Sequence, residues 1–253
     1  MTEFNGKTAL VTGASRGIGA ASAIALAEAG VSRVLIHYGS HRPGAEETLS
    51  AVRAKGADGA ILQGDLTTME GTHALIDAIA ADGASIDYLI NNAGSLLKRA
   101  PLPELTEDTF DAVMNLNVKS LWFITKAVAP GMIANGGGAI VNLSSIAARN
   151  GGGPGATIYA AAKAAVSAIT KGLAKELAPK GIRVNAVSPG TVDNHFHEVF
   201  STREILDNVV KATPLGRLAT NEDMADAVVY LCSSKSAYVI GQTIELNGGM
   251  FMI

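Results

Sequence analysis

The feature that most constrains the fold is a regular alternation of short apolar runs with longer alanine-rich stretches. Most of the apolar runs are continuous, which is typical of strands buried on both faces of a sheet. Strands are predicted at residues 8–12, 33–37, 60–63, 86–90, 139–143, 182–187 and 242–246. Helices are predicted near residues 17–29, 44–55, 69–81, 107–131, 157–177 and 221–232. Strand–helix alternation of this length implies right-handed crossovers, so the sequence predicts a doubly wound (Rossmann-type) parallel α/β sheet with helices on both faces.

The composition indicates one large globular domain. The chain has 253 residues, of which 48% are hydrophobic and 17% charged, so a sizeable core is available and disorder is not expected. No linker or low-complexity tract divides the chain, and we expect a single domain over residues 1–253. The net charge of −3, without a basic block, argues against nucleic acid or an anionic membrane as a partner.

The cysteine content and the start of the chain bear on localisation. Cys232 is the only cysteine, so no internal disulfide can form, which fits a reducing compartment. The first seven residues lack a cationic start followed by an apolar core, and no apolar run has the length of a membrane span. We expect a cytoplasmic protein.

A glycine-rich turn joins the first predicted strand to the first predicted helix. Residues 12–19 read Thr-Gly-Ala-Ser-Arg-Gly-Ile-Gly. A phosphate that approaches the backbone N–H groups there meets the positive end of the helix dipole, and glycine permits the close approach. The turn predicts a dinucleotide site; the alternative is a helix start with incidental glycines.

The segment after the second strand bears on the choice of nucleotide. Enzymes that select NAD often place a carboxylate there for the ribose 2′-hydroxyl, whereas an arginine accommodates a 2′-phosphate. Residues 37–42 read His-Tyr-Gly-Ser-His-Arg and contain no acid. We therefore predict NADP(H), with Arg16, Ser40 and Arg42 as candidate phosphate contacts. NAD(H) stays an alternative, and Arg42 could instead be solvated surface.

Two further segments follow predicted strands at the same edge of the sheet. Gly64-Asp65-Leu66 comes after the third strand and could hydrogen-bond an adenine ring. Asn91-Asn92-Ala93-Gly94 comes after the fourth strand, where asparagine and glycine are also ordinary turn residues. Their position at the ligand edge favours a binding role.

Tyr159 and Lys163 form a candidate catalytic pair. Four residues separate them, so they lie on one face of the predicted helix. Tyrosine is a poor acid–base group at neutral pH because its reference pKa is roughly 10. The lysine charge is expected to favour the phenolate and lower that pKa, which would make Tyr159 a general acid in reduction and a base in oxidation. The alternative is a buried tyrosine and a surface lysine on one helix.

The ordered series of motifs resembles the short-chain dehydrogenase/reductase family over essentially the whole chain. The matching motifs are Thr12-Gly13, Gly17-Ile18-Gly19, Asn91-Asn92-Ala93-Gly94, Asn117, Ser145, Tyr159-x-x-x-Lys163, Ser188-Pro189-Gly190, Pro214-Leu215-Gly216-Arg217 and residues 241–249. Within the family, the chain looks most like 3-oxoacyl-carrier-protein reductases. However, residues 134–138 lack the basic residues that those enzymes tend to offer an acidic carrier.

The resemblance implies roles for individual residues. Ser145 would hold the substrate oxygen beside Tyr159, with Ser144 as the alternative. Asn117 would organise a water that leads protons to Lys163, with Asn115, or a plain surface position, as alternatives. The implied nucleotide site consists of Gly13, Ser15, Arg16, Gly17, Ile18, Gly19, Ser40, Arg42, Asp65, Leu66, Asn92, Ala93, Gly94, Tyr159, Lys163, Pro189, Gly190, Val192 and Asn194.

The chain departs from the family pattern in two places. The spacing from Ser145 to Tyr159 is about a residue longer than in many relatives, through the glycine-rich residues 151–155, which predicts an enlarged loop over the pocket. Many relatives carry a threonine where this chain has Asn194, so Asn194 or Thr191 would make the nicotinamide contact.

His195 and His197 are expected to line a mobile loop over residues 191–213. Zinc would need further ligands at defined spacing, so no metal site is predicted. Phe110, Trp122 and Phe123 fit a helical core or a subunit contact. The resemblance implies a homotetramer, with the helices near 107–131 and 157–177 at one interface and the C-terminal strand at another.

The leading hypothesis is an NADP(H)-dependent reductase of a small ketone, aldehyde or 3-oxoacyl substrate. One alternative is an NAD-linked alcohol or sugar dehydrogenase. Another is a non-catalytic dinucleotide sensor or scaffold, since a fold does not fix a function. The joint presence of Asn117, Ser145, Tyr159 and Lys163 favours an enzyme.

Overall fold

The sheet is parallel and doubly wound. The computed structural model describes residues 3–252 and contains, within them, a seven-stranded sheet of order β3-β2-β1-β4-β5-β6-β7. All neighbouring strands pair in parallel, which confirms the predicted α/β fold. The strands are β1 Thr8–Val11, β2 Arg33–Tyr38, β3 Asp58–Gln63, β4 Tyr88–Asn91, β5 Gly138–Leu143, β6 Ile182–Pro189 and β7 Thr243–Leu246. The winding direction reverses between β1 and β4, where ligands bind in folds of this kind.

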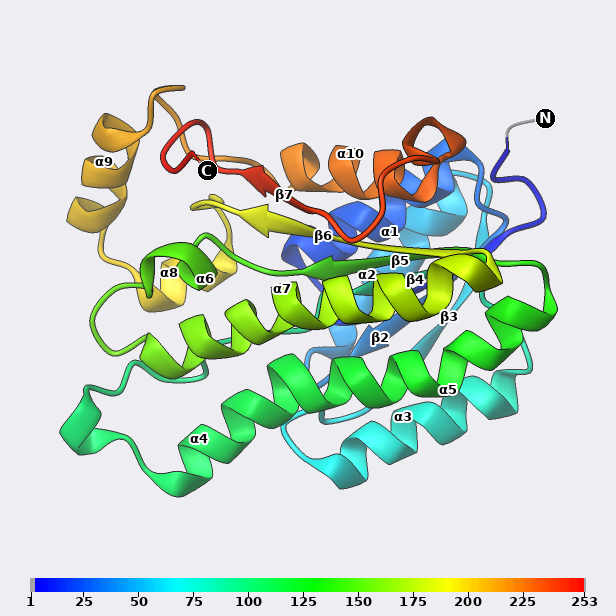
Figure 1. Cartoon of the computed structure of the whole chain (residues 1–253), viewed down its shortest axis with the longest axis horizontal. Coiled ribbons are helices and arrows are strands. Elements are labelled where there is room, and N and C mark those ends of the chain that lie inside the picture. Colours follow the sequence, from blue (N-terminus) through cyan, green and yellow to red (C-terminus); the bar gives the residue numbers. More distant parts are fainter. Residues whose placement is uncertain (1–2, 253) are drawn as a thin grey trace.

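Helices cover both faces of the sheet (Figure 1). The helices α1 (Gly17–Ala29), α2 (Arg42–Ala54) and α10 (Asn221–Cys232) share one apolar core, and α3 (Met69–Asp82), α5 (Ser120–Ala134) and α7 (Thr157–Leu177) share the other. Alternate residues of β2 supply the two cores, because successive strand side chains point to opposite faces. Val34 and Ile36 enter the first core and Leu35 the second.

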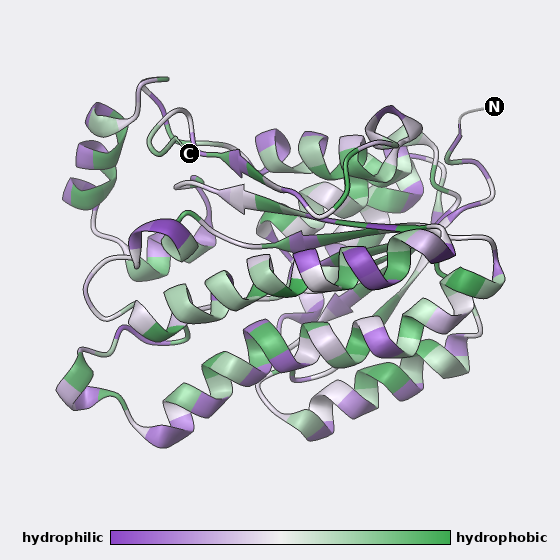
Figure 2. Cartoon of the chain, in the orientation of Figure 1, coloured by the Kyte–Doolittle hydropathy of each residue, from purple (hydrophilic) through white to green (hydrophobic). Residues whose placement is uncertain are grey.

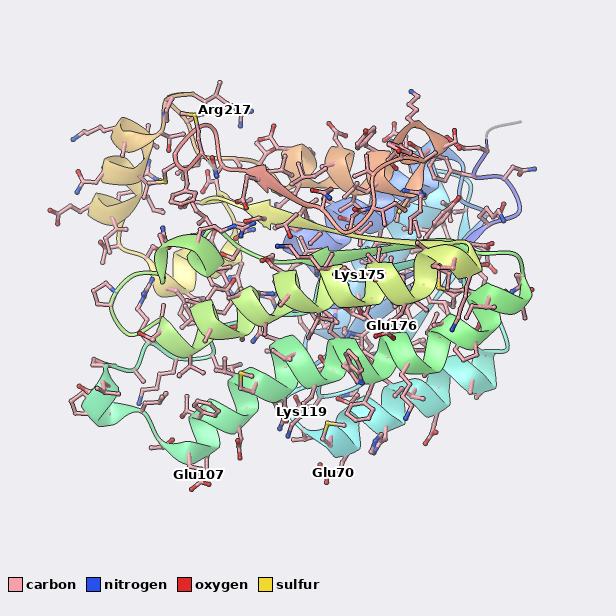
Figure 3. All side chains as sticks on the ribbon, viewed as in Figure 1. Glu70, Glu107, Lys119, Lys175, Glu176 and Arg217 are labelled. Atoms are coloured by element: carbon pink, nitrogen blue, oxygen red, sulfur yellow. The ribbon has the colours of Figure 1, made fainter. Side chains whose placement is uncertain are left out.

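Acidic side chains lie at the N-termini of two outer helices, where they interact favourably with the helix dipole. The exposed Glu70 lies in the first turn of α3, and Glu107 opens α4 (Glu107–Met114); Figure 3 labels both at the outside of the molecule. A carboxylate at a helix N-terminus stabilises the helix by about 0.3–1 kcal/mol. No helix among residues 3–252 is both long enough and apolar enough to cross a bilayer.

The helix predicted at residues 107–131 contains a wide turn. It runs from α4 through a π-helical stretch, Asn115–Lys119, into α5. The extra residue in a π turn rotates the following side chains relative to a straight helix. Asn117 consequently lies inside the protein, where it is 1% exposed.

The expectation of a loop over residues 191–213 was wrong for most of that segment, and its predicted mobility stays a prediction. It contains the short helices α8 (His195–Phe200) and α9 (Arg203–Ala212), which lie with α6 (Ala147–Asn150) at the carboxyl ends of β6 and β7 (Figure 1). Asn194 and Thr202 cap these helices by accepting hydrogen bonds from the Phe196 and Ile205 N–H groups. Helix α9 is amphipathic, as the two colours in Figure 2 show.

Candidate functional site

One cavity of about 1110 Å³ lies along the carboxyl edge of the sheet. It begins at the glycine turn after β1, passes the ends of β4 and β5, and ends against α8 and α9. The cavity therefore has two ends, a glycine end around Gly13–Gly17 and a helical end around Tyr159 and α8. Nearly every element that the sequence placed at the ligand edge contributes to its wall.

The glycine end has no room for side chains. Gly13 has φ +64°, and a Cβ there would lie 2.9 Å from the Cα of Ala93. A Cβ at Gly19 would lie 2.4 Å from the Gly13 carbonyl oxygen. Helix α1 starts beside the cavity with no side-chain cap and no acid in its first turn, so its first N–H groups are left for a ligand. These features fit the diphosphate of a dinucleotide.

His37 fastens the glycine turn, a role that the motif analysis missed. Its Nδ1 accepts a hydrogen bond from the Gly13 N–H at 3.0 Å, and its Nε2 lies 3.0 Å from the Gly64 carbonyl oxygen. The ring is therefore neutral with its proton on Nε2, and burial lowers its pKa to about 4. A histidine in an otherwise apolar buried strand needs such partners, and this was the available signal.

Asn92 and Thr12 join the ends of β1 and β4. The Thr12 hydroxyl accepts hydrogen bonds from the N–H groups of Asn92 and Ala93, both at 3.0 Å. The Asn92 amide nitrogen donates to the carbonyl oxygens of Thr12 and Gly13 at 2.8 and 3.0 Å. Asn92 thus fixes the shape of the turn, while Ala93 and Gly94 line the cavity beside it.

The candidate 2′-phosphate residues are only partly brought together. Arg16 and Ser40 line the cavity. Arg42 is absent from the described lining; it is 66% exposed and forms an ion pair with Glu46 at 2.8 Å. Ser15 instead lines a neighbouring hollow with Arg16 and His41.

The proposed adenine contacts lie further along the same wall. Asp65 and Leu66 both line the cavity. The Asp65 Oδ1 accepts hydrogen bonds from the N–H and hydroxyl of Thr67, which fixes the turn after β3.

Ser145 and Tyr159 meet at the other end of the cavity. Ser145 follows β5, and its side chain is close enough to Tyr159, in the first turn of α7, to lower the pKa of the phenol. Ser144 points the other way, and its hydroxyl donates to the Lys163 carbonyl oxygen at 2.9 Å inside the protein. The structure thus places Ser145, rather than Ser144, beside the tyrosine.

Lys163 is buried next to the pair. Its Nζ donates to the Leu143 carbonyl oxygen at 2.8 Å and lies 5.7 Å from the centre of the Tyr159 ring. Burial lowers the pKa of Lys163 to about 8. Burial also raises the pKa of Tyr159 to about 12, with the Ser145 side chain acting in the opposite direction.

The expectation that Lys163 lowers the phenol pKa was therefore wrong for this structure. Desolvation penalises both the phenolate and the ammonium ion and is the largest cause of both pKa shifts, and Lys163 is not among the groups that lower the pKa of the phenol. As a result the Tyr159 phenol is protonated at neutral pH.

Asn117 faces the same small space as Lys163. Its amide nitrogen donates to the carbonyl oxygens of Ser95 and Val113, both at 2.8 Å, while its Oδ1 is buried without a partner among the described residues. A Cβ at Gly94 would lie 2.6 Å from the Lys163 Nζ and 2.7 Å from the Asn117 Oδ1. The neighbouring Asn115 instead donates to the Thr67 carbonyl oxygen.

Asn194, in the segment after β6, makes hydrogen bonds that connect two helices. Its Oδ1 accepts a hydrogen bond from the Phe196 N–H at 3.1 Å, and its Nδ2 donates to the Asn221 Oδ1 at 3.0 Å. The amide thus joins the start of α8 to the start of α10. Pro189, Gly190, Thr191, Val192 and Asn194 all line the cavity, so contact with a nucleotide stays a prediction for them.

Aromatic side chains of α8 close the cavity over Tyr159. The Phe196 ring lies 5.9 Å from the Tyr159 ring and 5.0 Å from that of Phe200. His197 is adjacent, and burial, followed by the charge of Arg99, lowers its pKa to about 4. His195 is exposed beside Glu198, and no group of His, Cys, Asp and Glu side chains within residues 3–252 could hold a metal ion.

Known proteins resemble this chain in sequence and fold. Residues 13–251 match the family model described as enoyl-(acyl carrier protein) reductase. The 3-oxoacyl-[acyl-carrier-protein] reductase FabG of Staphylococcus aureus is 38% identical over 246 residues, which are 97% of this chain and 98% of that protein.

Two solved structures are similar over nearly their full lengths. A gluconate 5-dehydrogenase from Burkholderia cenocepacia, in complex with NADP and tartrate, has a TM-score of 0.87 at 33% identity and covers 97% of this chain and 95% of its own. An NADH-dependent reductase A1-R′ responsible for alginate metabolism has a TM-score of 0.86 at 35% identity and covers 100% of both chains.

The fold, the cavity and these relatives define an oxidoreductase that depends on a nicotinamide nucleotide. More specifically, the chain belongs to the short-chain dehydrogenase/reductase family.

Proposed function

We propose that the protein is an NADP(H)-dependent carbonyl reductase in which Tyr159 donates the proton. The observation that carries the proposal is the pairing of the Ser145 and Tyr159 hydroxyls at one end of a cavity whose other end is the glycine turn. Two neighbouring hydroxyl groups suit one carbonyl oxygen, which can accept a hydrogen bond from each. The family model's description names an enoyl reductase, but this hydroxyl pair favours a substrate that is reduced at a carbonyl group.

The residues of the site have separate roles in the proposed reaction. Ser145 orients the carbonyl oxygen, and Tyr159 transfers its phenolic proton to that oxygen. Lys163 and Asn117 bound a polar space that suits a water, which would return a proton towards Tyr159. The bound nicotinamide supplies the hydride. Helix α8 covers Tyr159 through Phe196 and restricts the access of bulk water.

The protonation state of Tyr159 decides its role in each direction. A protonated phenol donates to the carbonyl oxygen in reduction, whereas alcohol oxidation requires the phenolate. Burial raises the pKa of the phenol, so the protonated form prevails at neutral pH.

The nucleotide preference rests on Arg16 and Ser40. Both line the cavity, and residues 37–42 offer no carboxylate to a ribose 2′-hydroxyl. The two structural relatives differ here, since one holds NADP and the other is NADH-dependent. NAD(H) with an alcohol or a sugar thus stays the second candidate.

A 3-oxoacyl group is a further candidate substrate, because the curated relative from Staphylococcus aureus acts on one. We also propose a cytoplasmic homotetramer. Phe110 on α4 and Trp122 on α5 are each 41% exposed, and these large apolar side chains suit a subunit contact.

The test is a spectrophotometric screen of NADPH and NADH oxidation with ketones, aldehydes, 3-oxoacyl thioesters and an enoyl thioester. The proposal expects carbonyl substrates to be reduced and NADPH to be preferred. Reduction of the enoyl thioester alone would contradict the assignment of the hydroxyl pair. Tight binding of NADPH without turnover of any substrate would support the sensor alternative.

A further inference from the structure

Arg99 is a cation at the helical end of the cavity. Its hydrogen bonds to residues 3–252 use the guanidinium nitrogens Nε and Nη1 but not Nη2. It lies in the loop after β4 and lines the same cavity as Ser145 and Tyr159. Its Nε donates to the Phe200 carbonyl oxygen at 2.8 Å, and its Nη1 donates to the Pro154 carbonyl oxygen at 3.0 Å. Within residues 3–252, its Nη2 has no hydrogen-bond partner, and Arg99 takes part in none of the ion pairs.

The glycine-rich loop before Tyr159 holds Arg99 in place. The Ala100 N–H donates to the Gly155 carbonyl oxygen at 3.0 Å. A Cβ at Gly155 would lie only 2.9 Å from the Ala100 nitrogen, and one at Gly153 would lie 3.5 Å from the Arg99 Nη1. Residues 151–155, the loop that the sequence analysis expects to be enlarged, thus pack against this arginine through Gly153 and Gly155.

The charge of Arg99 is not balanced within the cavity wall. Asp65 is the only acid among the described lining residues, and it lies near the opposite end, after β3. The charge of Arg99 acts on His197, where it lowers the pKa more than Asp193 raises it. Burial of a guanidinium group without a counter-charge costs free energy. A carboxylate ligand can supply that counter-charge and accept charge-assisted hydrogen bonds from the free nitrogen.

The walls near Arg99 are otherwise largely apolar. Helices α8 and α9 contribute Phe196, Val199, Phe200, Ile205, Leu206 and Val209 to the same end of the cavity. A substrate there would meet apolar side chains over most of its body and one cation. This pattern suits an amphiphilic molecule that has a single acidic group.

We propose that the substrate is an oxo acid with an apolar body, whose carboxylate binds Arg99 while its ketone or aldehyde oxygen lies between Ser145 and Tyr159. The inference rests on the proposed function, because it names the class of carbonyl compound that this site reduces. Arg99 is then a specificity-determining residue as well as a link between α8 and the loop at residues 151–155.

The experiment compares straight-chain oxo acids of increasing length with their methyl esters, which differ only in the negative charge. The ratio of kcat/KM for acid over ester is measured in the wild-type protein and in Arg99→Gln and Lys98→Gln. Glutamine can still donate to a backbone carbonyl, and the exposed Lys98 lies outside the described cavity wall, so Lys98→Gln controls for the loss of a nearby positive charge. A purely structural role of Arg99 would change both substrates alike and leave the ratio constant.

We expect the wild-type ratio to be well above one, to fall about 10- to 100-fold in Arg99→Gln through KM, and to stay unchanged in Lys98→Gln. An ester reduced as well as the acid by the wild type, or an unchanged ratio in Arg99→Gln, would overturn the inference. If Arg99→Gln does not fold, inhibition of the wild type decides: apolar carboxylates should compete with a neutral carbonyl substrate much better than the matching amides, and equal inhibition would overturn it.

The two proposals fail in different ways. Reduction of neutral carbonyl compounds without preference for acids would leave the proposed function standing and remove the inference about Arg99. Bound NADPH with no reduction of either kind of carbonyl would remove both.

Discussion

The two ends of the cavity are built by different means. At the glycine end, the backbone itself forms the wall, and buried side chains such as His37, Thr12 and Asn92 bond to that backbone. At the helical end, side chains of two short helices form the wall. Arg99 and the Asn194 cap hold these helices to the rest of the protein.

The difference explains what each end can recognise. A backbone cradle at a helix N-terminus binds the phosphates that all dinucleotides share, so its sequence has little freedom. A wall of side chains on short helices can change its apolar and charged groups while the sheet stays the same. Nucleotide binding thus belongs to the rigid end, and substrate choice to the helical end.

The largest expected effect concerns the chemistry where the two ends meet. Tyr159→Phe should lower kcat by about 10²–10⁴-fold because the proton donor is lost. The dissociation constant for NADPH should change little, since the phosphates bind far from the phenol. Stopped-flow reduction and fluorescence titration of NADPH would check both. A variant that keeps more than a tenth of wild-type turnover would contradict the role given to the phenol.

The next effect concerns the pH dependence of the glycine end. His37 has a pKa of about 4 in the folded protein and an ordinary value of 6.5. The unfolded chain therefore binds the proton first, and stability should fall as the pH drops from 6.5 to 4, by up to about 3 kcal/mol.

Denaturant unfolding between pH 4 and 7 would show this loss, and His37→Asn should flatten it while keeping an acceptor near the Gly13 N–H. His197 also has a lowered pKa of about 4 and contributes to the same range, so the difference between variant and wild type isolates His37. Parallel stability curves for the two proteins would contradict the assigned neutral ring.

A matched pair of glycine substitutions contrasts the two ends. Gly19→Ala should destabilise the protein by about 1–3 kcal/mol, because the new methyl group would lie 2.4 Å from the Gly13 carbonyl oxygen. It should also weaken NADPH binding. In Gly153→Ala the methyl group would lie 3.5 Å from the Arg99 Nη1, an ordinary contact, so thermal stability and NADPH affinity should stay close to the wild type. Equal effects of the two changes on NADPH affinity would remove the distinction between the ends.

The smallest effect concerns the cap of α8. Asn194→Ala removes the acceptor for the Phe196 N–H and the link to Asn221, and should cost about 1 kcal/mol of stability. Because α8 covers Tyr159, KM for the carbonyl substrate should rise more than the dissociation constant for NADPH. Steady-state kinetics and thermal unfolding would measure this, and a larger effect on NADPH would show that Asn194 contacts the nucleotide instead.

The sequence predicted the sheet and the main helices because their signals are local. Continuous apolar strands and alanine-rich helices repeat along the chain, and each marks its own segment. The helices α8 and α9 escaped prediction because they are short, six and ten residues, and their capping residues Asn194 and Thr202 also suit loops. The π turn at Asn115–Lys119 escaped because the apolar pattern runs through it.

The candidate site was partly predictable for a similar reason. Gly13, Ser145 and Tyr159 lie in short motifs, and the parallel topology brings the ends of their elements to one edge. The tasks of His37 and Arg99 depend on partners far along the chain, Gly64 for one and Phe200 for the other, and no local pattern shows them. The direction of the phenol pKa shift was also misjudged, because burial cannot be read from a spacing of four residues.

The most direct test of the central claim is a crystal structure of the protein with oxidised NADP and an unreactive carbonyl analogue. We expect the diphosphate at the start of α1, and the nicotinamide beside Tyr159 with the analogue's oxygen against the Ser145 and Tyr159 hydroxyls. A nicotinamide bound elsewhere, or an analogue whose oxygen touches neither hydroxyl, would contradict the account.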